Sequence, residues 1–171
     1  MNRAKFICKI LFYITFLLGL LYLLTILYTS VCLITDWGTS TYGEGKYLHI
    51  FYPFTQTPFL NVDNNTAYKL FFFLLPLSFY ALFFLQASQV FKGFTKPKLF
   101  TIPNLGQLKR YYWLNLLLPL VGTVVASFFV EVEGSIAILT GVHFILGIFV
   151  FLLAEIFRQG LKLQNEQDLY I

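Results

Sequence analysis

The sequence predicts an all-α membrane protein built as a four-transmembrane-helix bundle, with both chain ends on the inner side. Three observations predict this fold class. The chain has 171 residues and is 58% hydrophobic but only 12% charged, whereas globular proteins average about 45–50% and about 25%. Its apolar residues fall into four runs of membrane-spanning length. Its basic residues are concentrated beside those ends of the runs that would lie on one side of the membrane.

Each of the four apolar runs is expected to form one span. The first run is too long for a cleaved secretion signal, whose apolar core covers about 7–15 residues. A hydrocarbon core about 30 Å thick needs about 20 residues of helix, and each of the other runs meets that length. The predicted spans cover residues 6–34, 68–91, 111–130 and 136–157.

The positions of Lys and Arg predict the orientation. With four spans, both termini share one side of the membrane. The opposite side holds only Lys46 and Lys69. Because Lys and Arg accumulate in cytoplasmic loops, we expect a cell-membrane protein with both termini cytoplasmic. The ten basic residues on that side are Arg3, Lys5, Lys9, Lys92, Lys96, Lys98, Lys109, Arg110, Arg158 and Lys162.

Three segments lie outside the predicted spans of this single membrane domain, residues 1–171. The outer segment, 35–67, contains the β-forming stretch KYLHIFY between turn residues, so a short strand or β-hairpin is expected there. The inner loop, 92–110, mixes lysines with apolar residues and is expected to lie along an anionic membrane surface. The cytoplasmic tail covers residues 158–171.

The sequence contains no motif that specifies a reaction. It lacks His-Glu-x-x-His, Gly-x-Ser-x-Gly, Cys-x-x-Cys and a phosphate-binding loop, each of which carries a known chemistry. We therefore expect a protein that is not an enzyme, with no catalytic residue, no metal site and no cofactor. The net charge of +4 suits anionic headgroups, so nucleic acid is not an expected partner.

Glu155 is the first candidate functional residue, because it lies near the end of an apolar run. It is two residues from the inner end of its span, so an interfacial ion pair with Arg158 at i+3 accounts for it. Another interpretation starts from the helix face. At 100° per residue, Glu155 shares a line with Ile148, Gly141 and Ala137, and small residues favour close helix packing, so Glu155 would then point at another helix.

His143 and Asn115 are the other polar candidates inside the spans. Ionisable groups deep in a membrane are costly and are therefore candidates for function. His143 is seven residues from the outer end of its span. An interhelical hydrogen bond is the simpler expectation for it, and a proton-linked role is the alternative.

The C-terminal segment LLAEIFRQGLKLQNEQDLYI resembles the ending of a bacterial family of small four-helix membrane proteins, catalogued only as domain of unknown function 2975. In that family the last helix runs into an acidic residue, then Phe-x-x-Gly, then Leu-Gln-x-Glu-x-Asp-Leu. The inner-loop KGFT also looks like the family's Gly-x-Pro-Phe-Thr without its proline, and Tyr170 replaces the usual Thr. The matching residues are Glu155, Phe157, Gly160, Leu163, Gln164, Glu166, Asp168, Leu169 and Ile171.

This resemblance implies a bacterial cytoplasmic membrane and a small helix-turn-helix regulator encoded nearby, but it implies no activity, because the family has none established. It also implies that the acidic tail belongs to the fold. Glu166 and Asp168 are then expected to face the inner loop, with Lys92, Lys96 and Lys98 as partners.

Two functions stay open at the level of sequence. The first is an accessory, regulatory or oligomeric interaction protein, whose partners are the lipid bilayer and a second copy or another membrane protein. The alternative is a small transporter or channel component that uses Glu155 and His143. Asn115 and the prolines inside two predicted spans, Pro76 and Pro119, motivate this alternative.

Overall fold

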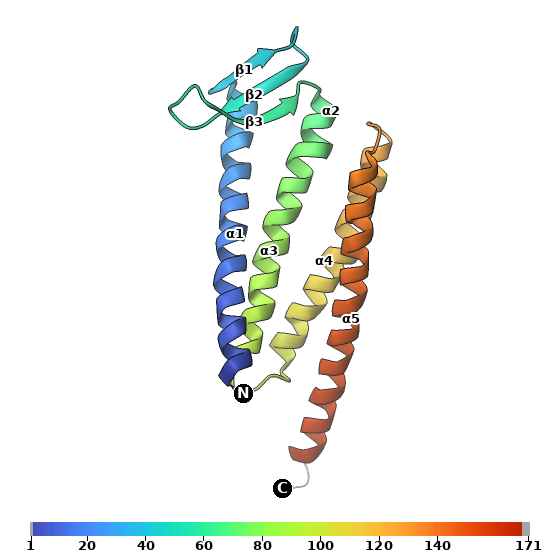
Figure 1. Cartoon of the computed structure of the whole chain (residues 1–171). Coiled ribbons are helices and arrows are strands. Elements are labelled where there is room, and N and C mark those ends of the chain that lie inside the picture. The colour runs from blue at the N-terminus through green and yellow to red at the C-terminus, as the bar shows by residue number, and fades with distance from the viewer. Residues whose placement is uncertain (1, 169–171) are drawn as a thin grey trace.

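A computed structural model describes residues 2–168 of the chain and consists mainly of long helices that lie side by side (Figure 1). A small sheet lies over one end of the N-terminal helices (Figure 1), and this end of the molecule is here called the sheet end. The chain order is α1 (Asn2–Thr35), β1 (Thr39–Tyr42), β2 (Tyr47–Phe51), β3 (Pro58–Asp63), α2 (Thr66–Tyr68), the π-helical turn η1 (Lys69–Leu74), α3 (Leu75–Phe94), α4 (Ile102–Ser127) and α5 (Gly134–Asp168).

Within residues 2–168, three helices are long and apolar enough to cross a membrane, namely Arg3–Thr35, Thr66–Phe94 and Gly134–Gln167. The first, second and fourth predicted spans lie within them. The third predicted span, 111–130, lies in α4 only as far as Ser127, where the helix ends, so its last three residues are not helical. α4 has 26 residues but is less apolar, because Arg110 and Asn115 interrupt its apolar residues. The structure therefore contains four long helices, three of which have the hydropathy of a span.

The long helices pack in chain order. α1 packs against α3, α3 against α4, and α4 against α5. Glycines allow two of these contacts: a Cβ on Gly19 would lie 2.8 Å from the Leu85 side chain, and one on Gly147 would lie 2.7 Å from the Leu116 side chain. The basic end, opposite the sheet, holds the N-terminal end of α1, the α3–α4 connection and the C-terminal end of α5 (Figure 1). The ten basic residues assigned to the cytoplasm lie toward this end.

The sequence predicts a short strand or hairpin in the outer segment. The structure has three antiparallel strands there, in the order β1-β2-β3. The predicted strand within residues 46–52 is confirmed as β2, the central strand. Tyr47 pairs with Tyr42 on one side and with Asp63 on the other. Leu48, Ile50 and Val62 form a small core with Cys32 of α1, and this core holds the sheet on the end of α1.

A hydrogen bond from the Tyr28 hydroxyl to the Phe51 carbonyl oxygen, 2.5 Å long, also ties the sheet to α1. We expect Tyr28→Phe to loosen the sheet by about 0.5–1.5 kcal/mol, since it removes one partly buried hydrogen bond. Amide hydrogen exchange of residues 47–63 should become faster. Tyr13→Phe is the control, because Tyr13 is 58% exposed. Unchanged exchange in Tyr28→Phe would contradict this attachment.

The connection between α3 and α4 is shorter than the predicted inner loop, because helix continues at both of its ends. α3 runs to Phe94 and α4 begins at Ile102. Thr101 caps α4 by accepting a hydrogen bond from the Asn104 backbone, and Asn104 Nδ2 donates to the carbonyl oxygens of Gly93 and Leu99. These bonds fold residues 95–101 back over the end of α3.

The predicted tail also continues a helix rather than leaving it. α5 extends to Asp168, past the ends of the other helices (Figure 1). The expected pairing of Glu166 with loop lysines is wrong, because Glu166 lies 3.8 Å from Lys162 one turn away on the same helix. The side chain of Asp168, and residues 169–171, lie outside the described part. α5 instead contacts the connection through Phe157 and Phe100, whose ring centroids are 5.2 Å apart.

Candidate functional site

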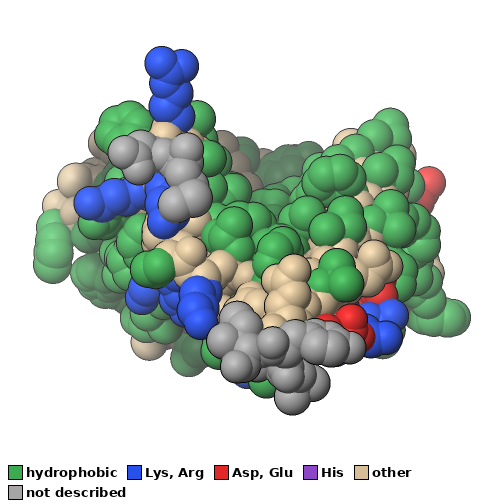
Figure 2. Space-filling view, turned by 90° about the horizontal axis from the view of Figure 1, so that it is seen from below, with side chains coloured by type: hydrophobic (Ala, Val, Ile, Leu, Met, Phe, Trp, Pro, Cys, Tyr) green, Lys and Arg blue, Asp and Glu red, His purple; other side chains and the backbone are tan. Residues whose placement is uncertain are grey.

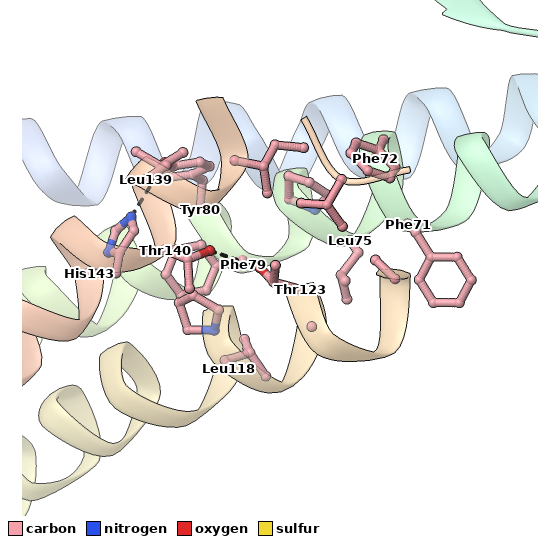
Figure 3. A pocket seen from close by; sticks show the side chains of 16 residues that line it. Phe71, Phe72, Leu75, Phe79, Tyr80, Leu118, Thr123, Leu139, Thr140 and His143 are labelled. Atoms are coloured by element: carbon pink, nitrogen blue, oxygen red, sulfur yellow. Dashed lines mark hydrogen bonds between the residues drawn. The ribbon is translucent and has the colours of Figure 1, made fainter. Parts of the chain in front are cut away.

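An apolar pocket lies between α3, α4 and α5. It lies toward the sheet end, and it is built around Phe79, Pro119 and Leu139 from the three helices. Figure 3 shows side chains of all three helices pointing into the same space. Twelve of its sixteen lining residues are apolar; the polar ones are Tyr80, Thr123, Thr140 and His143.

His143 provides the polar end of the pocket. It is 6% exposed, and it joins two other helices. Its Nδ1 lies 2.9 Å from Asn115 Oδ1 on α4, and its Nε2 lies 3.4 Å from the Tyr80 hydroxyl on α3. The rings of Phe79 and Phe83 flank it edge to face. The predicted interhelical hydrogen bond of His143 is thus present, and its α4 partner is the other candidate residue, Asn115.

The Asn115 amide determines which imidazole nitrogen carries the proton. Asn115 Nδ2 donates to the Tyr111 carbonyl oxygen at 2.8 Å, so Oδ1 is the atom that faces His143 Nδ1. An amide oxygen only accepts, and Nδ1 must therefore donate. This geometry fits the neutral imidazole with its lone pair on Nε2, facing Tyr80. Because the contact to Tyr80 is long for a hydrogen bond, Nε2 can accept a shorter one from another donor.

A second polar pair lies further along the pocket wall. The hydroxyls of Thr123 on α4 and Thr140 on α5 are 2.8 Å apart, and Figure 3 shows this bond beside the pocket. One of the two hydroxyls donates to the other, and such bonds commonly join membrane helices. His143 Nε2 and the Tyr80 hydroxyl, which share one long contact, are therefore the polar atoms of the pocket whose hydrogen-bonding capacity is least used.

The pocket ends at His143 and does not continue toward the basic end. Beyond it, buried residues of the same three helices form the largest apolar core, Ala87, Val90, Leu108, Tyr111, Tyr112, Val150, Ala154 and Phe157. The cavity measures about 100 Å³, somewhat less than the cavity of about 150 Å³ that accommodates benzene. It therefore has room for a short chain or for one end of a longer amphiphile.

Glu155 lies apart from this pocket, at the basic end. Its carboxylate forms an ion pair of 2.5 Å with Arg158, as the interfacial interpretation predicts. The side chains of Glu155 and Arg158 are 30% and 65% exposed. The other interpretation, in which the line of Ala137, Gly141 and Ile148 packs inward, is wrong for this chain.

These three residues face outward, and no side chain lies within 4 Å of a Cβ built on Gly141. The inward face of α5 carries Gly147, Val150, Ala154 and Phe157 instead. Both faces are apolar and both contain small residues. The physical reason for the error is that apolarity does not separate a lipid-facing surface from a helix-facing one.

We expect Glu155→Gln to lower the free energy of unfolding by less than about 1 kcal/mol, because a partly exposed ion pair one turn apart contributes little. Chemical unfolding of the full chain in mixed micelles measures this change. Arg158→Gln should have a similarly small effect, and the double variant should add almost nothing. A loss of about 3 kcal/mol or more would show that Glu155 has a buried role.

The sequence interpretation did not single out Tyr80, Thr123 or Thr140 as a polar group of this site. A tyrosine in the middle of an apolar run is a signal that could have found Tyr80, since buried hydroxyls usually have a partner. The sequence gives no comparable signal for the two threonines. Residues 2–168 contain no group of three or more His, Cys, Asp and Glu side chains that could hold a metal ion.

The chain was compared with protein families, with curated proteins and with solved structures. No family model matches it, and neither a curated protein nor a solved structure does. The resemblance of the C-terminal segment to a family therefore stays a prediction.

Proposed function

We propose that the chain is a four-span membrane protein that acts as a non-enzymatic accessory or regulatory component by binding a small amphiphile in the His143 pocket. The observation that carries this proposal is that a mostly apolar pocket has an incompletely used hydrogen-bond acceptor at one end. Apolar side chains line most of its wall, and one incompletely used acceptor, His143 Nε2, lies at its closed end. Binding sites for small molecules commonly combine an apolar lining with few polar groups.

A four-span topology is supported by the way α4 packs. Its 26 residues extend over about 39 Å at 1.5 Å per residue, which exceeds a hydrocarbon core of about 30 Å. It lies between α3 and α5, each part of a helix apolar enough to span a membrane. The basic end would then face the cytoplasm, because Lys and Arg accumulate there.

The pocket chemistry supports a ligand with an alkyl or ring portion and one hydroxyl group. The apolar portion would lie along Phe79 and Leu139, and the hydroxyl would donate to His143 Nε2. A ligand carbonyl could instead accept from the Tyr80 hydroxyl. Because the large aromatic and aliphatic lining offers no charge, an ionic ligand would lose its hydration without compensation.

A partner in the membrane is supported by the outward face of α5. Ala137 and Gly141, four residues apart, both face outward. Small residues at this spacing let two membrane helices approach closely. A second copy or another membrane protein at this face would join the pocket to an assembly, as an accessory or regulatory component requires.

A transporter or channel component using Glu155 and His143 is the second candidate. The burial of His143 within an apolar helix favours it. Its support is weaker, because Val150 and Ala154, which lie between the two residues on α5, belong to the closed core. A route for a solute would have to cross that core.

Photolabelling of the full chain in lipid nanodiscs tests the proposal. The probe is an octanol analogue that carries an alkyl diazirine, and the competitors are 1-octanol and octane. Labelled peptides should come from the pocket parts of α3, α4 and α5. We expect octanol to compete about three- to tenfold better than octane, because only octanol can use the acceptor. His143→Leu should remove this difference.

His49→Leu is the matched control, since His49 belongs to the outer sheet and bonds to Asn61. It should keep the preference for octanol. Labelling spread evenly over all lipid-facing segments, or equal competition by octane and octanol, would contradict a specific pocket.

A further inference from the structure

A groove lined by three lysines lies at the basic end, between the start of α1 and the end of α3. Lys5 and Lys9 come from α1, and Lys92 comes from α3. The groove offers about 530 Å³ of open space, and its other lining residues are Phe6, Phe12, Tyr13 and Thr95. In Figure 2, which looks onto the basic end, Lys and Arg side chains gather on the side of the molecule where α1 lies.

The charges of these lysines are not compensated within the described chain. The described carboxylates at this end, Glu155 and Glu166, pair with Arg158 and Lys162 on α5. No ion pair among the described side chains involves a groove lysine. Three like charges around one groove raise the local potential and attract an anion.

The walls of the groove indicate what kind of anion fits. The Phe6 and Tyr13 side chains are 65% and 58% exposed, and the Lys92 ammonium lies 5.8 Å from the centre of the Phe12 ring. The exposed rings continue directly into the apolar surface of α1. A free anion would leave these rings uncovered, whereas a lipid would cover them with its acyl chains.

We propose that this groove binds the phosphate group of an anionic glycerophospholipid. The three ammonium groups surround the headgroup, and the acyl chains lie along the exposed side of α1 beyond Tyr13. The site joins two segments far apart in the sequence, residues 5–13 and 92–95. A bound lipid thereby holds the start of α1 against the end of α3.

Native mass spectrometry of the full chain tests this site, with phosphatidylglycerol and phosphatidylcholine as the probes. The natural sequence should retain phosphatidylglycerol far better than phosphatidylcholine. The K5Q/K9Q/K92Q variant should lose that preference, because each lysine near the anionic group is expected to strengthen phosphatidylglycerol binding about fivefold. The K96Q/K98Q/K109Q variant removes three basic residues from the same end outside the groove, and it should keep the preference. The K5R/K9R/K92R variant should keep it as well.

Three outcomes would overturn the proposal. One is equal retention of phosphatidylglycerol by the two glutamine variants, which would assign the effect to general charge at the basic end. Another is complete displacement of phosphatidylglycerol by excess inorganic phosphate, which would make the groove a site for a free anion. The third is loss of the lipid preference in a K5R/K9R/K92R variant that melts at the same temperature as the natural sequence.

Discussion

Gly147→Val is expected to lower the free energy of unfolding by about 1–3 kcal/mol, because it forces extra atoms into a filled contact. A Cβ at this position would lie 2.7 Å from the Leu116 side chain and 3.2 Å from the Leu116 backbone nitrogen. The side chain of Leu116 can move, but its backbone belongs to α4 and cannot. α4 and α5 should therefore separate. Unfolding of the full chain in mixed micelles is the measurement.

Gly141→Val is the matched control for this prediction. Gly141 lies on the same helix, and no atom lies within 4 Å of a Cβ built there. In a monomer, which has no partner on this face, the same substitution should therefore change the free energy of unfolding by only a few tenths of a kcal/mol, mainly through helix propensity. If Gly147→Val and Gly141→Val were equally harmless, the packing of α5 on α4 described here would be wrong.

Ala126→Leu is expected to lower specific photolabelling of the pocket by the octanol probe by about tenfold or more, while leaving the protein folded. Ala126 is buried and lines the pocket. The added carbon atoms of leucine would occupy part of a cavity of about 100 Å³. Filling an apolar cavity commonly stabilises a protein by about 0.5–2 kcal/mol, so the melting temperature should stay the same or rise.

Ala137→Leu is the control for pocket filling, because Ala137 faces outward on α5 and does not line the pocket. Its labelling should match that of the natural sequence. Undiminished labelling in Ala126→Leu, in a protein that melts at least as high, would show that the probe binds elsewhere.

The helices themselves could be predicted from the sequence, because membrane-spanning length and apolarity are local properties. The predicted strand in the outer segment also depends on local residues, and it is β2. Its partner strands were harder to predict, because β1 and β3 become strands by pairing with β2 and by covering Cys32 of α1. The ion pair of Glu155 with Arg158 could be anticipated, because i,i+3 neighbours share a helix face.

The pocket could not be predicted, because it depends on how three helices are rotated about their axes. Helical periodicity places Glu155, Gly141 and Ala137 on one line, but it does not say whether that line faces lipid or protein. His143 and Asn115 are 28 residues apart, and the sequence alone offers no reason to pair them. The 100 Å³ cavity arises between side chains of three separate segments.

Nitrogen-15 magic-angle-spinning NMR of histidine-labelled protein in lipid bilayers tests directly whether the pocket recognises a hydroxyl group through His143. The chain has only two histidines, and His49→Gln assigns the signals. We expect His143 to carry its proton on Nδ1, and we expect 1-octanol to shift the Nε2 resonance whereas octane does not. A proton on Nε2, or an Nε2 resonance that octanol leaves unchanged, would contradict a pocket that recognises its ligand through His143.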